Sequence, residues 1–164
     1  MRAGIALGSN LGDRRINLLL AIENLKKIHQ GPPSSFLSSS IHETEPLDCP
    51  VDSPDFLNAV IQLETDCSPR ELLKQLQAIE VGFGRPPEHA HHAPRTIDLD
   101  LLYCEKLPSC FSDFIIESTS DLELPHPRIR ERLFVLAPLV EIVPDIVLPG
   151  WTKTAKGYLL LLNK

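Results

Sequence analysis

The sequence lacks the features that mark several common classes of protein. It has four cysteines but no C-x-x-C pair, which argues against a zinc ribbon or a dense disulfide framework and favours reduced thiols. No uncharged run approaches the length that spans a membrane, and the first residues, MRAGIALGSN, do not form the apolar core of a signal peptide. We therefore expect a cytoplasmic protein with no membrane partner.

Aromatic residues and positive charge are also scarce. Aromatics make up 5% of the 164 residues, and 22 acidic against 16 basic side chains give a formal net charge of −6. Nucleic-acid binders concentrate positive charge, so no nucleic-acid partner is expected. One stretch is nevertheless rich in arginine and leaves room for a single anion-binding site: it holds Arg85, Arg95, Arg128, Arg130 and Arg132.

The length fits one domain, residues 1–164, and the apolar pattern predicts its elements. Short apolar or alternating segments indicate four strands, and two stretches with apolar residues three and four apart indicate helices. The expected strands are residues 3–7, 36–44, 56–65 and 97–104. The expected helices are capped by Asp13 and by Ser68, with apolar stripes at Leu18, Ile22, Leu25 and Ile28 and at Leu72, Leu73, Leu76, Ile79 and Phe83.

This βαββαβ order predicts an α+β fold of the ferredoxin-like type, an antiparallel sheet with both helices packed on it. The last third is expected to add a C-terminal extension with a short helix. Pro127 is predicted as its first helical residue, with Arg128 and Arg132 on one helix face. The 15 prolines fall mainly in the loops, which we expect to be stiff.

The strongest chemical signal is PRTIDLDLL, residues 94–102. On a strand, Asp98 and Asp100 project from one face while Ile97, Leu99 and Leu101 point into the core. Two such carboxylates suit Mg²⁺, which takes its remaining ligands from water and phosphate oxygens. The alternative is a strand face with two solvated acids.

Arginines beside these acids favour a phosphate site. Arg85 and Arg95 flank the loop before the D-x-D strand, and guanidinium groups can grip two phosphate oxygens at once. His126 stands next to three further arginines, and this local positive charge favours a phosphate contact. The alternatives are ordinary Asp–Arg ion pairs and a structural histidine.

Two other motifs are interpreted as structural. His89, His91 and His92 lie on a loop without Cys or Asp at ligand spacing, so we expect them to be solvated rather than to bind a transition metal. GSNLG, residues 8–12, lacks the G-x-x-x-x-G-K-[ST] pattern and is expected to be a tight strand-to-helix turn.

Five segments together resemble the 6-hydroxymethyl-7,8-dihydropterin pyrophosphokinase family over nearly the whole chain. They are GSNLG at 8–12, FLNAV at 56–60, the IE..FGR of 79–85, PRTIDLDLL at 94–102 and PHPRIRERLFVLAPLVEIVP at 125–144. The resemblance implies an ATP-dependent enzyme of folate biosynthesis that transfers pyrophosphate to the pterin hydroxymethyl group and releases AMP. Its substrates would be ATP and a reduced hydroxymethylpterin, its cofactor two Mg²⁺ ions, and we expect a monomer.

The resemblance also implies roles for individual residues. Asp98 and Asp100 would hold the metal ions, and Arg85 and Arg95 would engage the triphosphate. The remaining ATP-site positions would be Gln77, Glu80, His126 and Arg132. The pterin would meet Asn58 at its polar edge, Phe56 and Phe134 on its two faces, and the segment of Thr44, Pro46 and Leu47.

The chain departs from many family members at Pro87 and His92, in the loop that closes over ATP in the family, and no general base is evident. The competing class is a non-catalytic ferredoxin-like module that binds RNA or a small ligand. The low aromatic content and acidic charge count against RNA, and a sensor would not need D-x-D beside arginines. Mg²⁺-dependent ATP binding would separate the two classes.

Overall fold

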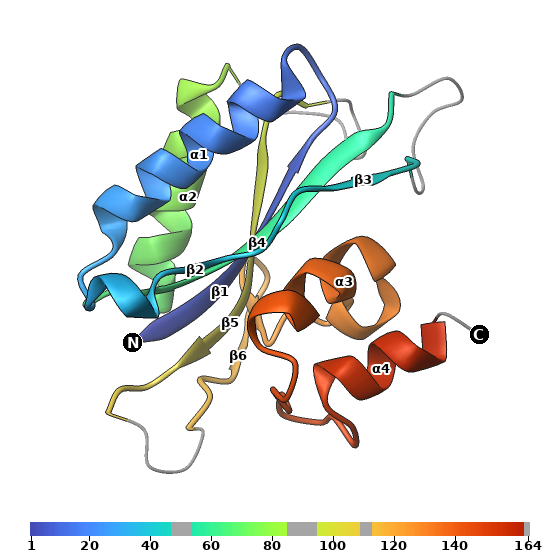
Figure 1. The fold of residues 1–164 in the computed structure, drawn as a ribbon. Coiled ribbons are helices and arrows are strands. Elements are labelled where there is room, and N and C mark those ends of the chain that lie inside the picture. The colour runs from blue at the N-terminus through green and yellow to red at the C-terminus, as the bar shows by residue number, and fades with distance from the viewer. Residues whose placement is uncertain (47–53, 85–94, 109–112, 163–164) are drawn as a thin grey trace.

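The computed structural model describes residues 1–46, 54–84, 95–108 and 113–162, which fold into an antiparallel sheet with helices on both faces (Figure 1). None of the helices in these ranges is long and apolar enough to cross a membrane. In chain order the elements are β1 (Arg2–Ser9), α1 (Arg14–Ile28), η1 (Pro33–Ser35), β2 (Leu37–Ser38), β3 (His42–Thr44), β4 (Phe56–Glu64), α2 (Pro69–Gly82), β5 (Asp98–Glu105), β6 (Glu117–Ser118), β7 (Glu123–Leu124), η2 (Ile129–Glu131), α3 (Leu133–Ile142) and α4 (Ala155–Leu162).

The main sheet has β1 at its centre. β4 and β5 pair antiparallel on its two sides, and β2 and β3 both pair with the outer edge of β4. Residues 36–44, expected as one strand, therefore form two. The interruption lies at Ser39, whose Oγ accepts a hydrogen bond from Val60 N at 2.9 Å in place of a backbone carbonyl.

Helices α1 and α2 begin where their capping residues predict. Asp13 Oδ1 accepts from Ile16 N at 3.0 Å, and α1 ends with Lys26 and Lys27 in its last turn, where positive charge favours the helix dipole. Ser68 and Glu71 form a reciprocal capping box at the start of α2. The expected apolar stripes of both helices pack on one face of the sheet.

That face forms the first of two apolar clusters. It joins Ala3, Ile5 and Leu7 of β1 to the stripes of α1 and α2, and Ile97, Leu99 and Leu101 are buried in it as predicted. The second cluster covers the opposite face, where α3 and α4 pack on Val60, Leu102 and Tyr103 (Figure 1). Both faces of the sheet are therefore covered, apart from the polar row described below.

The prediction for the start of the C-terminal helix is wrong. Pro127 and Arg128 lie in a turn that leads into η2, and α3 begins only at Leu133, with Arg132 as its extended N-cap. Arg128 and Arg132 therefore do not share a helix face. The reason is tertiary: His126 N bonds Leu102 O at 2.7 Å, which docks this segment on the outer edge of β5 before the apolar run of α3 starts.

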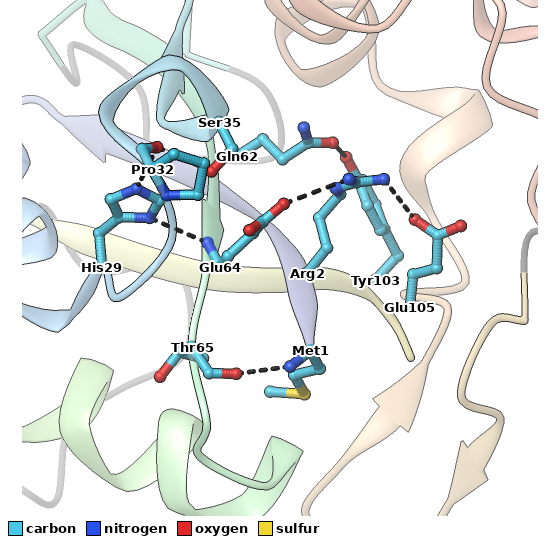
Figure 2. Close-up of polar contacts among 10 residues, drawn as sticks. All are labelled: Met1, Arg2, His29, Pro32, Ser35, Gln62, Glu64, Thr65, Tyr103 and Glu105. Atoms are coloured by element: carbon cyan, nitrogen blue, oxygen red, sulfur yellow. Dashed lines mark hydrogen bonds and ion pairs between the residues drawn. The ribbon is translucent and has the colours of Figure 1, made fainter. Parts of the chain in front are cut away.

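A polar network closes one end of the sheet (Figure 2). Arg2 bridges two strands, with Nη2 3.2 Å from Glu64 Oε1 and Nη1 3.0 Å from Glu105 Oε2. The buried Tyr103 hydroxyl donates to Gln62 Oε1 at 2.9 Å. Its ring lies over Gly4, where a Cβ would come within 2.2 Å of it, so only glycine fits there. This end of the sheet is filled by the protein itself.

A β-bulge divides β5 into two halves. Tyr103 pairs with Gly4 and Leu101 pairs with Ile5, so Leu102 is an extra residue with no partner on β1. Before the bulge, odd-numbered residues face α1 and α2; after it, Cys104 does so while Tyr103 faces α3. The two thiols in the described ranges, Cys67 and Cys104, are free, and burial raises the pKa of Cys104 to about 12.

Candidate active site

Polar side chains form a row across the sheet at the end opposite to the Arg2 network. Gly8 of β1 pairs with Asn58 of β4 on one side and with Asp98 of β5 on the other. Ala6 likewise stands between Val60 and Asp100. Because side chains alternate along a strand, Asn58, Asp98 and Asp100 share the face on which α3 packs. The predicted common face of the two aspartates is thus present, and Asn58 lies on it.

The lack of a side chain at Gly8 keeps the middle of this row open. A Cβ there would lie 3.4 Å from Asn58 Oδ1, 3.7 Å from a ring carbon of Phe56 and 4.0 Å from Asp98 Cβ. Glycine therefore leaves a strip of bare backbone between Asn58 and Phe56 on one side and the D-x-D pair on the other. A flat ligand can approach the sheet closely along such a strip.

Each aspartate has an arginine beside it. Arg95 Nη1 lies 3.3 Å from Asp98 Oδ1, and Arg132 Nη1 lies 3.6 Å from Asp100 Oδ2. The Nε atoms of both arginines are buried and have no hydrogen-bond partner in the part of the chain that the structure describes. These unpaired N–H donors suit an anionic ligand. The guanidinium groups would bind its oxygens, and a cation held by the neighbouring aspartates would balance the rest of its charge.

The N-terminal end of α3 adds further groups to the same face. Arg132 Cζ stands 5.5 Å above the ring centre of Phe134, a cation–π contact. The pKa of Arg132 is lowered overall. Burial and then the neighbouring Arg128 are the main causes, and they outweigh the opposite effect of Asp100 and Asp98. The guanidinium is therefore partly desolvated, which strengthens its interaction with an anion.

His126 is held as a neutral ring. Its Nδ1 accepts a hydrogen bond from Arg128 N at 3.2 Å, so the proton of the neutral ring sits on Nε2. Burial, followed by the charges of Arg132 and Arg128, lowers the pKa of His126 to about 4. At neutral pH this side chain offers an N–H donor without a positive charge.

The turn after β1, residues 8–12, is interpreted from the sequence as structural only. Its hydrogen bonds fix Arg95 and Thr96, the residues that lead into β5. Asn10 N donates to Arg95 O at 3.2 Å, and Arg95 N donates to Asn10 Oδ1 at 2.8 Å. Ser9 Oγ donates to Thr96 O at 2.6 Å. Nothing local in the sequence indicates these pairings, because they join residues more than eighty positions apart.

Glu80 supports β5 from the other side. Its carboxylate lies on α2, is 8% exposed, and Oε1 accepts a hydrogen bond from Leu99 N at 2.9 Å. β5 is the edge strand of the described sheet, so no carbonyl of a further strand in that sheet is available to accept from Leu99 N–H. Glu80 supplies the acceptor instead. Glu80, predicted as an ATP-site position, therefore also fixes the residue between the two aspartates.

Three of the residues predicted to bind the pterin, Thr44, Phe56 and Asn58, lie together at the β3–β4 edge. Thr44 pairs with Phe56, and its Oγ1 accepts from Asn58 Nδ2 at 2.8 Å. Asn58 is 5% exposed and its Oδ1 is directed along the strip at Gly8. Pro46 follows Thr44 at the edge of the described residues. Leu47, Arg85 and the loop with Pro87, His89, His91 and His92 lie outside them, and Gln77 is exposed on α2.

The donor set for a metal is small. Among the residues that the structure describes, no three His, Cys, Asp or Glu side chains come together as a metal cage. Asp98 and Asp100 supply one carboxylate each, and an ion held there takes its other ligands from water or substrate. That is the way Mg²⁺ is bound at polyphosphate sites.

The site combines acids suited to a divalent cation, arginines suited to phosphate and an open strip beside an amide and an aromatic ring, a combination compatible with an ATP-dependent transferase. The sequence profile of the 7,8-dihydro-6-hydroxymethylpterin-pyrophosphokinase (HPPK) family matches residues 4–144. The chain belongs to this family.

Relatives from other organisms agree. The chain is 43% identical over 145 residues to the 2-amino-4-hydroxy-6-hydroxymethyldihydropteridine pyrophosphokinase of Bacillus subtilis, covering 88% of this chain and 79% of that protein. The enzyme of the same name from Methylorubrum extorquens is 37% identical, with 92% and 88% covered. It follows that the protein transfers pyrophosphate from ATP to the hydroxymethyl group of 6-hydroxymethyl-7,8-dihydropterin in folate biosynthesis. The alternative of a non-catalytic module is set aside.

Solved structures share the fold. The wild-type HPPK–DHPS of Plasmodium falciparum with pteroate matches 98% of this chain with a TM-score of 0.65 at 15% sequence identity. This chain spans 42% of that longer protein. The α+β architecture with an antiparallel sheet is therefore that of solved HPPK structures.

Proposed function

We propose that ATP and the pterin meet on the row formed by Asn58, Gly8 and Asp98. The single observation that carries this proposal is the register of three strands, which places an amide, a bare backbone strip and a carboxylate side by side. The pterin would lie on the Asn58 side, between the rings of Phe56 and Phe134. The triphosphate would lie on the Asp98 and Asp100 side.

On the pterin half, the contacts of Asn58 decide what it offers. One N–H of its amide donates to Thr44; among the described residues nothing else binds the amide, so Oδ1 and the second N–H are available to a ligand. A heteroaromatic edge with both donors and acceptors complements such an amide. Stacking between aromatic rings supplies affinity, and the amide selects the orientation that directs the hydroxymethyl group toward the phosphates.

On the ATP half, Arg95 and Arg132 would exchange part of their contact with the aspartates for the phosphate oxygens. His126 would donate through Nε2, and Gln77 and Arg85 complete the expected set. Asp98 and Asp100 would hold two Mg²⁺ ions, which would supply positive charge against the triphosphate. The pterin hydroxyl would bond the β-phosphorus while the bond from that phosphorus to the α-phosphate oxygen breaks and AMP leaves. The arginines orient the phosphate chain in line with the pterin hydroxyl.

We also propose the finer features of the fold and assembly. The order β2–β4–β1–β5, with α1 and α2 on one face, supports a ferredoxin-like sheet with a C-terminal extension on the other face. Two apolar clusters that share this sheet support one domain over residues 1–164. A monomer in the cytoplasm remains our expectation.

The test measures AMP formation from ATP, Mg²⁺ and the reduced hydroxymethylpterin. Asp98→Asn and Asp100→Asn should each lower kcat strongly, by an effect worth several kcal/mol, without changing the fold. The matched control is Asp145→Asn, an exposed carboxylate between α3 and α4. Near-normal kcat in both variants at saturating Mg²⁺ would refute the proposed metal site, and ADP as the stoichiometric product would refute attack at the β-phosphorus.

A further inference from the structure

One carboxylate of α3 binds the β2–β3 segment through three contacts. Glu141 Oε2 accepts from Ser40 N at 2.7 Å, and Oε1 accepts from Ser40 Oγ at 2.8 Å. Glu141 Oε1 also lies 2.6 Å from His42 Nε2. Partial burial raises the pKa of Glu141, but the hydrogen bonds from Ser40 and the contact with His42 outweigh it, and the net shift is downward.

A serine, a histidine and a glutamate in contact bring a hydrolytic triad to mind, but this geometry excludes one. Ser40 Oγ lies 3.3 Å from the same Nε2 of His42 that contacts Glu141. In a triad the acid must hold the other ring nitrogen, so that the histidine can take the serine proton. Ser40 here donates directly to the acid. The cluster therefore connects two elements and does not activate a nucleophile.

The connection is one strand away from the proposed pterin amide. His42 pairs with Asn58 across β3 and β4, and Thr44, two residues further, pairs with Phe56 and accepts from Asn58. β3 has three residues and lies at the edge of the sheet. So short an edge strand needs support from outside the ladder to keep its position.

The other partner of the connection is the helix that carries Phe134. Leu136 and Leu139 bury α3 in the second apolar cluster, but apolar burial is non-directional, so polar contacts add the directional part of the restraint. Glu141 lies seven residues after Phe134, roughly 10 Å along the helix. Three polar contacts at that distance from the ring fix the helix against the strand that supports Asn58.

We propose that Glu141 is a positioning residue for the pterin half of the site. Through Ser40 and His42 it sets the separation between Phe134 on α3 and the Phe56–Asn58 side of the sheet. Its loss would increase the distance between α3, which carries Phe134, and the Phe56–Asn58 side of the sheet, and would leave Arg95 and the D-x-D strand in place. This inference rests on the proposed assignment of Asn58, Phe56 and Phe134 to the pterin.

Steady-state kinetics with each substrate varied separately test the proposal. Glu141→Gln keeps the size of the side chain but loses the charge and one acceptor, and should raise KM for the pterin about three- to tenfold while KM for ATP changes less than about twofold. Ser40→Ala, which removes one of the three contacts and no packing, should shift the same constant in the same direction by less. Glu23→Gln, which breaks a surface ion pair of α1, is the matched control.

The outcomes separate this inference from the site assignment. Asn58→Ala should also raise KM for the pterin. If it does and Glu141→Gln and Ser40→Ala do not, the positioning role is wrong and the site assignment stands. If Asn58→Ala leaves that KM unchanged, both are wrong. Equal increases for ATP and pterin in Glu141→Gln would show general loosening and would also overturn the proposal.

Discussion

Asn10 is bound to the backbone of Arg95 through two hydrogen bonds: Asn10 N donates to Arg95 O at 3.2 Å, and Arg95 N donates to Asn10 Oδ1 at 2.8 Å. Asn10 is 2% exposed, so neither bond is shared with solvent. Arg95 stands three residues before Asp98 and contacts it. The turn that follows the first strand therefore fixes the backbone from which the Arg95 side chain extends.

The first prediction follows from this pair. Asn10→Ala leaves the partly buried Arg95 N–H without an acceptor and should lower the free energy of unfolding by about 1–3 kcal/mol. It should also reduce kcat by a larger factor than it changes KM for the pterin. Urea denaturation and kinetics measure the two effects. Asn24→Ala, which removes an exposed amide that bonds Leu20 O, is the control. Wild-type kcat in Asn10→Ala would contradict the positioning role of the turn.

The second prediction separates two roles of Glu80. Glu80→Gln keeps an oxygen for Leu99 N and should preserve stability, whereas Glu80→Ala should cost about 1–3 kcal/mol of unfolding free energy because Leu99 N–H loses its acceptor. Calorimetric titration with a non-hydrolysable ATP analogue measures the binding role. Weaker binding by Glu80→Gln at unchanged stability would support direct contact with ATP. Unchanged binding would leave Glu80 as a support for β5 alone.

A third prediction concerns Phe134. Phe134→Ala should raise the Kd for pterin about two- to tenfold, since one face of an aromatic pair is worth about 0.5–1.5 kcal/mol beyond buried area. The Kd for the ATP analogue should change much less. Phe134→Leu keeps most of the apolar volume in the second cluster and serves as the comparison. Equal weakening of both ligands would place the ring in the core rather than at the pterin.

The fourth prediction is a pH dependence at His126. Its pKa is lowered from 6.5 to about 4, so between these values the unfolded chain binds more protons than the folded one. Above pH 6.5 the histidine is neutral in both states and does not affect stability. As the pH drops from 6.5 toward 4, protonation of the unfolded chain lowers the free energy of unfolding. After allowance for partial exposure, the loss is roughly 2 kcal/mol.

The variant His126→Asn isolates that effect. Asn can still accept from Arg128 N but does not titrate, so its unfolding free energy should fall less than that of the wild type between pH 7 and pH 4.5. Chemical denaturation at both pH values gives the comparison. Identical pH dependence of the two proteins would mean that His126 is protonated in the folded state as readily as in the unfolded chain.

Patterns within one element were predictable from the sequence. The caps at Asp13 and Ser68, the alternation of β4 and the common face of Asp98 and Asp100 follow from local spacing, which the structure keeps. The resemblance to the family supplied the roles of residues that no spacing explains, such as Asn58. These roles stay predictions until the variants are measured.

Features that depend on distant contacts were not predictable. Ser39 divides the expected 36–44 strand because its hydroxyl meets Val60, and η2 replaces the expected helix start because His126 docks on Leu102. The contacts of Asn10 and Glu141 likewise join residues far apart in the chain. Neither a propensity nor a period carries information about such pairs.

The extra residue in β5 has a consequence for changes of chain length. Because Leu102 is inserted between them, Asp98 and Asp100 on one hand and Tyr103 on the other face the same side of the sheet although their numbers differ in parity. Deletion of Leu102 would restore regular alternation and leave Asp98, Asp100 and Tyr103 on their present side, because Leu101 and Tyr103 would become neighbours. Deletion of Leu99 would instead put the two carboxylates on opposite faces of the sheet. A change of chain length in this strand is therefore tolerable at the extra residue and not within the D-x-D motif.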